Sequence, residues 1–417
     1  MEKTILEMAK EKIFSQEIEK AFKNEEFSSK EEFLNKIAQG KIVIPANKKR
    51  KRENYYAIGD GCTVKINANI GVTADFSSFD IELKKAELCE KYQVESVMDL
   101  SCGKYAKTFR DKLIKEFSFI VGSVPVYDLA VKLKDFKMAK SKDFLEVLEE
   151  HVELGVDFVT IHAGINMKLI EKLENSGRIL NIVSRGGSMI YRWMVENKKE
   201  NPYYEYFDDV LKILKKYDVV ISIGDAFRSG CIFDSGNFLQ LEETIEVSKL
   251  AKIAQNYGIQ VIIEGPGHMK ADEISYTVKT IKKLCNDAPL YVLGPLITDI
   301  SAGYDHISGS MGALISALSG ADFLCYVTPA EHLRLPDLQD VKEGIIAFKI
   351  AAHSANLVRG FKKAIEKDFN MAVARSNLDW DKIIESSIDP DKARAYRNGL
   401  KDTCSMCGEL CAIKNSR

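Results

Sequence analysis

The chain has 417 residues, 46% of them hydrophobic, and its 59 basic and 61 acidic side chains give a formal net charge of −2. This hydrophobic content can supply a sizeable core, whereas a charge so close to zero gives no field that would attract nucleic acid. No stretch approaches the roughly 18 uninterrupted apolar residues of a membrane span, and the start lacks an apolar signal region. We therefore expect a globular cytoplasmic protein that binds no membrane, and nine cysteines, an odd number, fit a compartment that keeps thiols reduced.

The first 60 residues predict a small N-terminal cap of charged helices. Phe14, Ile18 and Phe22 recur at helical spacing, and so do Phe33 and Ile37. The cap ends near the one basic run of the chain, residues 48–52, which we expect to be a solvated loop.

From residue 64 the pattern changes to short apolar runs, each followed by a charged helical stretch, about every thirty residues. The nine runs span residues 64–70, 96–100, 118–126, 157–162, 179–184, 218–224, 259–264, 289–293 and 321–327. Such alternation predicts a parallel sheet covered by helices, and eight units close a (β/α)8 barrel. The count leaves one strand more than the barrel needs.

We predict an α/β fold with a (β/α)8 barrel. A doubly wound open sheet is the alternative, but no Gly-x-Gly-x-x-Gly follows the first strand, as a dinucleotide fold would prefer. The predicted domains are the cap at 1–60, the barrel at 61–337, and a helical segment at 338–417 that ends in a cysteine-rich tail.

Polar residues end nearly every apolar run, which is where a barrel places its active site. Taken singly, each could be a turn residue, a helix cap or a core tyrosine. Together, Arg185 and Arg228 supply forked donors suited to phosphate, and the glycines after Arg185 let backbone amides approach an anion. The sequence therefore predicts a phosphorylated small substrate. The candidate residues are Asn67, Asn69, Met98, Asp99, Tyr127, His162, Ser184, Arg185, Gly186, Gly187, Asp225, Arg228, Glu264, His268 and His332.

Two histidines, His268 and His332, each follow a strand and could share a divalent metal. Two imidazoles would leave coordination positions open for substrate or water. A hydrogen-bonded pair without metal is the alternative, and His306 is a third candidate ligand. We expect His151 and His353 on helix surfaces.

The tail Cys404-Ser-Met-Cys407-Gly-Glu-Leu-Cys411 holds three closely spaced cysteines. A [4Fe–4S] cluster bound by three cysteines keeps one iron open for a small molecule, whereas structural zinc normally takes four protein ligands. We predict the cluster. Zinc with a distant fourth ligand, a thiol–disulfide pair and cysteines without function remain alternatives.

Seven motifs occur in order along most of the chain, from about residue 40 to the end. They are Ile66-Asn-Ala-Asn-Ile-Gly71, Met98-Asp-Leu-Ser101, Val124-Pro-Val-Tyr127, Ile182-Val-Ser-Arg-Gly-Gly-Ser188, Glu264-Gly-Pro-Gly-His268, Gly303-Tyr-Asp-His306 and Cys325-Tyr-Val-Thr-Pro-Ala-Glu-His332. Together they resemble the phosphomethylpyrimidine synthase family of radical S-adenosylmethionine enzymes.

This resemblance implies a homodimer of barrels that acts on 5-aminoimidazole ribotide and takes electrons from a donor such as flavodoxin or ferredoxin. A 5′-deoxyadenosyl radical, made from S-adenosylmethionine at the cluster, would abstract hydrogen from the ribose. The implied cluster ligands are Cys404, Cys407 and Cys411, which would act in catalysis with Glu264, and the implied ligands of a zinc or iron ion are His268 and His332. The implied substrate contacts are Asn69, Met98, Tyr127, His162, Ser184, Arg185, Gly186, Asp225, Arg228, Glu264 and Tyr291.

Several residues depart from the family pattern. Ser229, Lys270 and Ala302 stand where the family has prolines, three residues rather than four separate Cys407 from Cys411, and the usual Thr-Gln-Met opening is absent. Losing rigid turns beside the site suggests altered loops. We therefore favour the divergent paralogue 5-hydroxybenzimidazole synthase, a radical carbon–carbon lyase that makes the lower-ligand precursor of an anaerobic cobamide from the same ribotide. The alternatives are hydroxymethylpyrimidine phosphate synthesis for thiamin and a non-catalytic ribotide-binding partner subunit.

Overall fold

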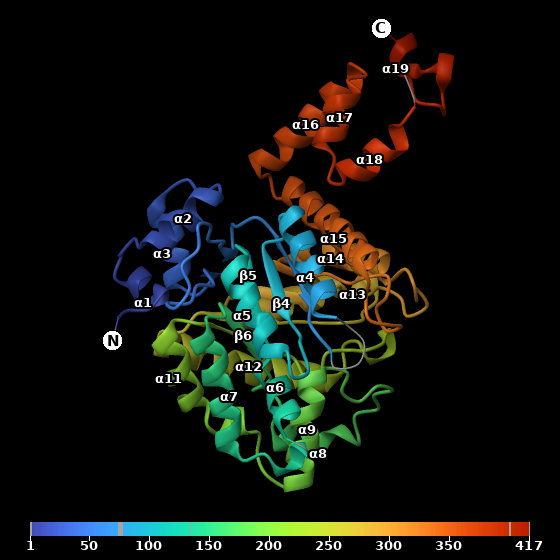
Figure 1. The fold of residues 1–417 in the computed structure, drawn as a ribbon. Helices are drawn as coiled ribbons and strands as arrows, with labels where there is room; N and C mark the ends of the chain where they lie inside the picture. The colour runs from blue at the N-terminus through green and yellow to red at the C-terminus, as the bar shows by residue number, and fades with distance from the viewer. Residues whose placement is uncertain (1, 74–77, 134, 400–401, 417) are drawn as a thin grey trace. The chain divides into compact units, whose positions relative to one another are not determined.

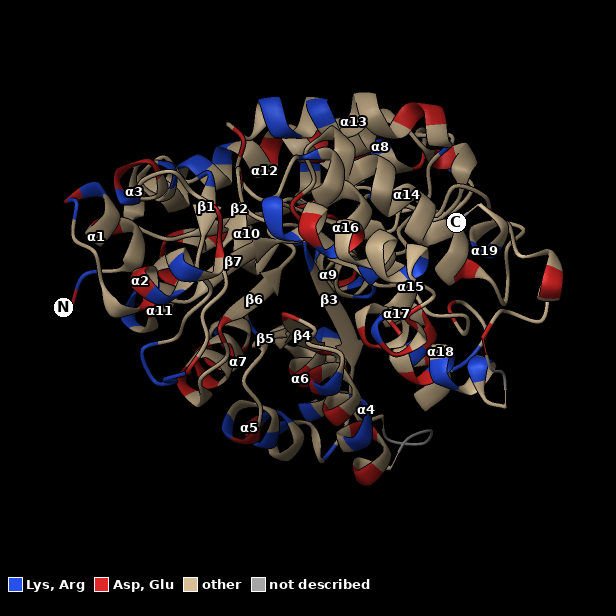
Figure 2. Ribbon diagram, turned by 90° about the horizontal axis from the view of Figure 1, so that it is seen from above, with Lys and Arg blue, Asp and Glu red and all other residues tan. Residues whose placement is uncertain are grey.

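The computed structural model describes residues 2–73, 78–133, 135–399 and 402–416, which form two compact units, residues 1–352 and 353–417 (Figure 1). The domain limits drawn from the sequence, at residues 60 and 337, stay predictions. No helix of the described residues is long and apolar enough to cross a membrane. Both basic and acidic residues are spread over the outer helices in Figure 2, in keeping with the small net charge.

The first unit contains the predicted barrel, with eight parallel strands closed in the order β10-β3-β4-β5-β6-β7-β8-β9. Nearly all residues of these strands are buried, as in a parallel sheet covered on both faces, and this is why the strands read as apolar runs. The strands are β3 (Lys65–Ile70), β4 (Ser96–Asp99), β5 (Ile120–Ser123), β6 (Phe158–Ile161), β7 (Val220–Ile223), β8 (Val261–Glu264), β9 (Leu290–Leu293) and β10 (Phe323–Cys325).

Helices follow the strands around the barrel (Figure 1). Polar caps set where several begin: Ser78 accepts from the amide of Ile81, and Asn237 from that of Leu239. The helices are α4 (Phe79–Lys91), α5 (Ala106–Glu116), α6 (Pro125–Lys132), α7 (Ser141–Leu154), α8 (Met167–Leu173), α9 (Arg185–Asn197), α10 (Pro202–Glu205), α11 (Phe207–Tyr217), α12 (Phe238–Tyr257), α13 (Ala271–Leu284) and α14 (Asp305–Ser319), with short 3₁₀ turns at Phe136–Met138 and Ile232–Asp234.

The N-terminal region contains three helices, of which α2 and α3 lie at the two stretches where the spacing predicts helix, and a two-stranded antiparallel sheet. These elements are α1 (Ile5–Lys10), α2 (Gln16–Asn24), α3 (Lys30–Ala38), β1 (Ile42–Val43) and β2 (Ile58–Gly59). Ile18, Phe33 and Ile37 are fully buried in one apolar cluster. The hydroxyl of Thr4 donates to the Gly258 carbonyl over 2.6 Å and so joins α1 to the end of α12.

The basic run at 48–52 is only in part the solvated loop that we expected, because its lysines reach solvent and its two arginines do not. Arg50 and Arg52 are 5% and 7% exposed. Arg50 donates to the buried carboxylate of Asp157 and to the carbonyls of Ile114 and Phe119, both over 3.0 Å. A buried guanidinium is tolerated because these acceptors satisfy it. The run therefore anchors the N-terminal region to the barrel.

The expected strand at 179–184 is also wrong: these residues form an irregular segment between α8 and α9. The carboxylate of Asp234 accepts from the amides of Ile179 and Leu180, over 2.7 and 2.8 Å, in place of a strand neighbour. Arg178 donates to the carbonyls of Phe227 and Arg228, each over 2.9 Å. This segment is thus tied to the loop after β7, and the barrel closes with the remaining eight runs.

The second unit is helical. Its elements are the end of α15 (Leu338–Val358), α16 (Lys362–Ser376), α17 (Trp380–Ser386), α18 (Pro390–Arg397), a 3₁₀ turn at Gly408–Leu410 and α19 (Ala412–Asn415). The Arg397 guanidinium lies 3.7 Å from the centre of the Trp380 ring and donates to the Thr403 carbonyl over 2.8 Å. The indole of Trp380 donates to the Asp402 carbonyl over 2.8 Å. These contacts hold the start of the cysteine tail against its own helices.

Candidate functional site

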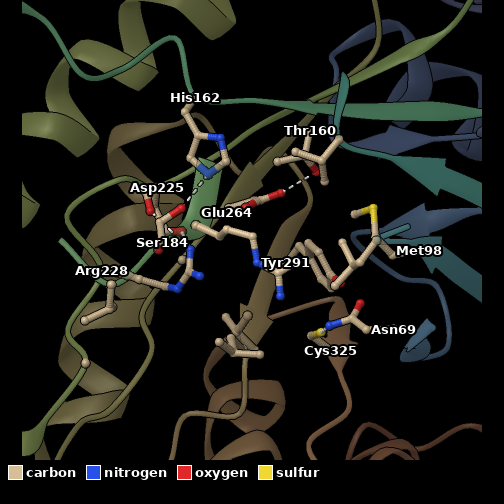
Figure 3. A pocket seen from close by; sticks show the side chains of 18 of the residues that line it. Asn69, Met98, Thr160, His162, Ser184, Asp225, Arg228, Glu264, Tyr291 and Cys325 are labelled. Atoms are coloured by element: carbon tan, nitrogen blue, oxygen red, sulfur yellow. Dashed lines mark hydrogen bonds and ion pairs between the residues drawn. The ribbon is translucent and has the colours of Figure 1, made fainter. Parts of the chain in front are cut away.

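A cavity of about 360 Å³ lies at the carboxyl ends of the barrel strands. Figure 3 shows side chains from different strands turned toward one another around it. Every predicted substrate residue lines it except Gly186, which packs against His162, and the two histidines predicted to bind metal line it as well. The predicted residues in the lining are Asn69, Met98, Tyr127, His162, Ser184, Arg185, Asp225, Arg228, Glu264, Tyr291, His268 and His332.

Glu264, the last residue of β8, points into the cavity and is held by two hydroxyls (Figure 3). Thr160 on β6 and Ser222 on β7 both donate to its Oε1, each over 2.8 Å. Burial raises the pKa of Glu264, against the opposing effect of these hydrogen bonds and of Arg228. Because both hydroxyls donate to Oε1, they leave Oε2 available to accept from a ligand.

The His162 imidazole is fixed from three sides. Its Nε2 is 2.6 Å from the hydroxyl of Ser184, which also caps α9 by accepting from the amide of Gly187. A Cβ atom on Gly186 would lie 2.5 Å from the ring, and one on Gly224 would lie 2.8 Å from it. Burial, and then the nearby Arg228, lower the pKa of His162 to about 3, so the ring is neutral near pH 7.

Arginines supply the positive charge of the cavity. Arg228 pairs with Asp225, with Nη1 and Oδ1 3.0 Å apart, and burial raises the pKa of Asp225 well above its ordinary value although Arg228 opposes this. Arg185 is the first residue of α9, and its guanidinium lies 5.1 Å from the centre of the Tyr127 ring. Two guanidinium groups beside a helix N-terminus make this part of the cavity suited to a phosphate.

The side chains of Asn69 on β3, Tyr291 on β9 and Cys325 on β10 form another part of the lining. Asn67 donates to the Tyr291 hydroxyl over 2.8 Å and to the side-chain oxygen of Asn69 over 2.9 Å. Asn69 in turn donates to the Cys325 sulfur over 3.1 Å. This network fixes the orientation of the Asn69 amide, and burial raises the pKa of the Tyr291 hydroxyl, which stays protonated.

The rings of His268 and His332 lie together, with centroids 5.1 Å apart. Nδ1 of His268 is 2.7 Å from Asp299, and Nδ1 of His332 is 3.4 Å from Asp305. His306 lies outside the lining of the cavity, with its Nε2 3.9 Å from Glu343. The structure thus brings together the two histidines that the sequence singled out, and not the third candidate.

The expectation that His151 lies on a helix surface is wrong. Its side chain is 1% exposed and lies between Ser123, 2.9 Å from Nδ1, and Asp128, 3.0 Å from Nε2. Arg110 joins Asp128 to Asp99, over 3.0 and 2.8 Å. This buried network supports the ends of β4 and β5, next to Met98 and Tyr127.

Comparison with known proteins identifies the chain. The model of the Radical SAM ThiC family matches residues 4–417. The chain belongs to this family. It is 49% identical to phosphomethylpyrimidine synthase of Clostridium botulinum (strain Loch Maree / Type A3), over 99% of this chain and 95% of that protein. The protein of the same name from Clostridium tetani (strain Massachusetts / E88) is 48% identical, over 99% of this chain and 91% of its own length.

Among solved structures, dihydropteroate synthase of Xanthomonas albilineans aligns with 76% of this chain and all of that chain, at 12% identity and a TM-score of 0.42. The family that the seven motifs indicated is confirmed by the sequence comparisons. Membership of the radical SAM ThiC family implies a [4Fe–4S] cluster and S-adenosylmethionine.

The donor set of the tail suits the cluster of this family. Cys404, Cys407 and Cys411 supply three thiols, with Cys407 exposed and Cys411 buried. Backbone amides of Cys407 and Met406 lower the pKa of the Cys404 thiol, which favours the thiolate form that binds iron. Throughout the described residues, no group of three or more His, Cys, Asp or Glu side chains is arranged to hold a metal ion.

Some residues of the site were not predicted. Thr160 could have been found, because it stands on β6 two positions before His162, which directly follows the strand, and alternating residues of a strand face the same side. Ser222 and Asp299 gave no such signal, since each acquires its place through the fold of a distant segment. Glu331 could have been found, because it directly precedes His332 in the last of the seven motifs.

Proposed function

We propose that this protein is a phosphomethylpyrimidine synthase that converts 5-aminoimidazole ribotide into hydroxymethylpyrimidine phosphate for thiamin biosynthesis. The observation that carries the proposal is the 49% identity, over nearly the whole of both chains, to proteins of that name. These relatives favour the thiamin alternative over the 5-hydroxybenzimidazole synthase that we favoured from the missing prolines. Both activities start from the same ribotide, so the cavity is compatible with either.

The cavity suits a heterocycle joined to a phosphate. Arg228, Arg185 and the N-terminus of α9 would bind the phosphate group. Elsewhere in the lining, Oε2 of Glu264 would accept from an amino or hydroxyl group, and the oriented amide of Asn69 and the protonated Tyr291 hydroxyl would position the ring. A ribotide has these two ends, and the fixed groups would hold its ribose between them.

The tail and the histidine pair would hold the inorganic groups. We assign the cluster to Cys404, Cys407 and Cys411, and one divalent ion, zinc or iron, to His268 and His332. When bound, the cluster and S-adenosylmethionine supply the radical chemistry of the family. The family resemblance implies that this chemistry acts on the ribose. The protein would keep the ribotide in one orientation, with His162 neutral and Glu264 fixed by two hydroxyls. We further propose a cytoplasmic homodimer that receives electrons from flavodoxin or ferredoxin.

The test is anaerobic incubation of the reconstituted protein with the ribotide, S-adenosylmethionine and a strong reductant, followed by mass analysis. Hydroxymethylpyrimidine phosphate and 5′-deoxyadenosine are the expected products. Hydroxybenzimidazole instead would assign the chain to cobamide synthesis, and ribotide binding without either product would indicate a partner subunit.

Two tail variants serve as controls. Cys407→Ala should lose iron and deoxyadenosine formation while still binding the ribotide. Ser405 lies in the same turn and is not proposed to bind the cluster, so Ser405→Ala should behave like the unmodified chain.

A further inference from the structure

One segment of the chain contacts both histidines of the proposed metal site. This segment, residues 294–305, runs from the end of β9 to the first residue of α14 and carries Asp299 and Asp305. Asp299 Oδ1 lies 2.7 Å from Nδ1 of His268, and Asp305 Oδ2 lies 3.4 Å from Nδ1 of His332. The two histidines come from different loops, after β8 and after β10, so the segment is their common support.

Each carboxylate is itself fixed by a further donor. Both oxygens of Asp299 accept from the amide of Ile232, over 3.3 and 3.0 Å. Asp305 is buried, and the Ser301 hydroxyl donates to its other oxygen, Oδ1, over 2.6 Å. The carboxylates can therefore orient the imidazoles rather than follow them.

The backbones of the two histidines differ: that of His268 is held by hydrogen bonds, and that of His332 takes an unusual conformation. The amide of His268 donates to the Ser229 carbonyl over 2.9 Å, and the Ser229 hydroxyl donates to the carbonyl of His268. His332 has a φ of 60°, in the left-handed region that non-glycine residues rarely adopt. Its side chain is 54% exposed, against 9% for His268. His332 is thus the less enclosed ring and depends more on its one carboxylate contact.

An ionised carboxylate can only accept, so each Nδ1 carries the hydrogen and each Nε2 keeps its lone pair. In the described part of the chain, neither Nε2 has a hydrogen-bond partner. We propose that Asp299 and Asp305 are positioning residues that present both Nε2 atoms to one divalent metal ion. This inference rests on the metal site of the proposed function and adds the residues that set its ligand geometry.

The test measures Zn²⁺ affinity by competition with a chromophoric chelator. It uses the full chain with Cys404→Ala, Cys407→Ala and Cys411→Ala, so that the tail thiols cannot bind the ion. Added to this background, Asp299→Asn and Asp305→Asn should each weaken Zn²⁺ binding by about 10- to 100-fold, as loss of an outer carboxylate partner typically does. Asp272→Asn, which changes an exposed carboxylate in the first turn of α13, should leave the affinity unchanged.

Ser301→Ala removes the hydroxyl that fixes Asp305 but leaves both carboxylates in place, and it should weaken binding by a smaller factor. Thermal unfolding of each metal-free variant separates positioning from stability, because a positioning role predicts weaker binding at an unchanged midpoint.

Unchanged Zn²⁺ affinity in both aspartate variants would overturn the inference. If the background chain binds no Zn²⁺ and His268→Ala changes nothing, the metal assignment itself is wrong. The product assay of the proposed function would be unaffected, because it reads the organic products of the unmodified chain.

Discussion

His162 shows how tightly single residues are constrained in this cavity. Its ring lies between the main chains of Gly186 and Gly224, and its Nε2 meets the Ser184 hydroxyl. No other residue fits at either glycine without moving the ring, because any side chain adds a Cβ atom inside contact distance. The position of the His162 ring therefore depends on the lack of a side chain at both Gly186 and Gly224.

Gly186→Ala tests this arrangement. The added methyl group would lie 2.5 Å from the imidazole, so the ring has to shift and its contact with Ser184 is disturbed. We expect a loss of about 1–3 kcal/mol in the free energy of unfolding, typical of overpacking, and weaker ribotide binding by isothermal calorimetry. Ser188→Ala is the matched control, since within the described part of the chain the Ser188 hydroxyl donates to the Arg185 carbonyl of the same helix and to no other group. Equal ribotide affinity in the two variants would show that the close packing of Gly186 and Gly224 does not position His162 for ribotide binding.

For single residues, the sequence predicted which side chains line the cavity better than it predicted their hydrogen-bond partners. Asn69, His162 and Glu264 could be found because each ends an apolar run and a barrel gathers such ends at one face. The partner of Glu264 on β7, Ser222, lies 42 positions away and has no local pattern. Hydrogen bonds between distant segments depend on strand register, which hydrophobic periodicity does not specify.

Among the elements, the segment at 179–184 shows the limit of apolar patterning. Ile179, Leu180 and Val183 resemble a strand, yet they are 67%, 42% and 39% exposed. A carboxylate, Asp234, accepts from two of the amides that a strand would pair in a ladder. Periodicity cannot separate a buried strand from an apolar loop whose backbone is satisfied by a side chain.

The contact between α1 and α11 predicts a pH-dependent stability. Asp218, in the left-handed position that ends α11, accepts from the amide of Ile5 over 2.8 Å. Burial raises the pKa of Asp218 from its ordinary 3.8 to about 8. Between these values the folded chain holds a proton that the unfolded chain has lost, so this group's contribution is fully present below pH 3.8 and is lost as the pH rises to about 8.

Asp218→Asn should remove that dependence. Asparagine stays neutral, can still accept from Ile5, and tolerates the left-handed conformation. We expect the variant to exceed the unmodified chain in stability at pH 8.5, by on the order of a few kcal/mol, and by less at pH 5. Urea unfolding at the two pH values measures this. Asp209→Asn, on the same helix but exposed and paired with Lys212, should show no such change. A constant difference between the two pH values would contradict a buried, protonated Asp218.

At the scale of the whole molecule, the barrel was predictable and the attachment of the N-terminal region was not. Eight strands buried on both faces leave eight apolar runs in the sequence, which is a strong signal. In the sequence, Arg50 is one member of a basic run. Its role in joining the N-terminal region to the barrel follows from its ion pair with the buried Asp157, 107 positions away. A charge pattern gives no sign of burial when the neutralising group is distant in the chain.

The division into two units leads to the last prediction. Every residue that lines the cavity belongs to residues 1–352, whereas all three cysteines proposed to hold the cluster belong to residues 353–417. A chain that stops after Gly360 keeps α15 complete and removes the rest of the second unit. We expect it to bind the ribotide within about twofold of the full chain, because every described residue that lines the cavity is kept. It should form no deoxyadenosine. Calorimetry and circular dichroism test binding and folding; a folded truncated chain that no longer binds ribotide would mean that the second unit contributes to the substrate site.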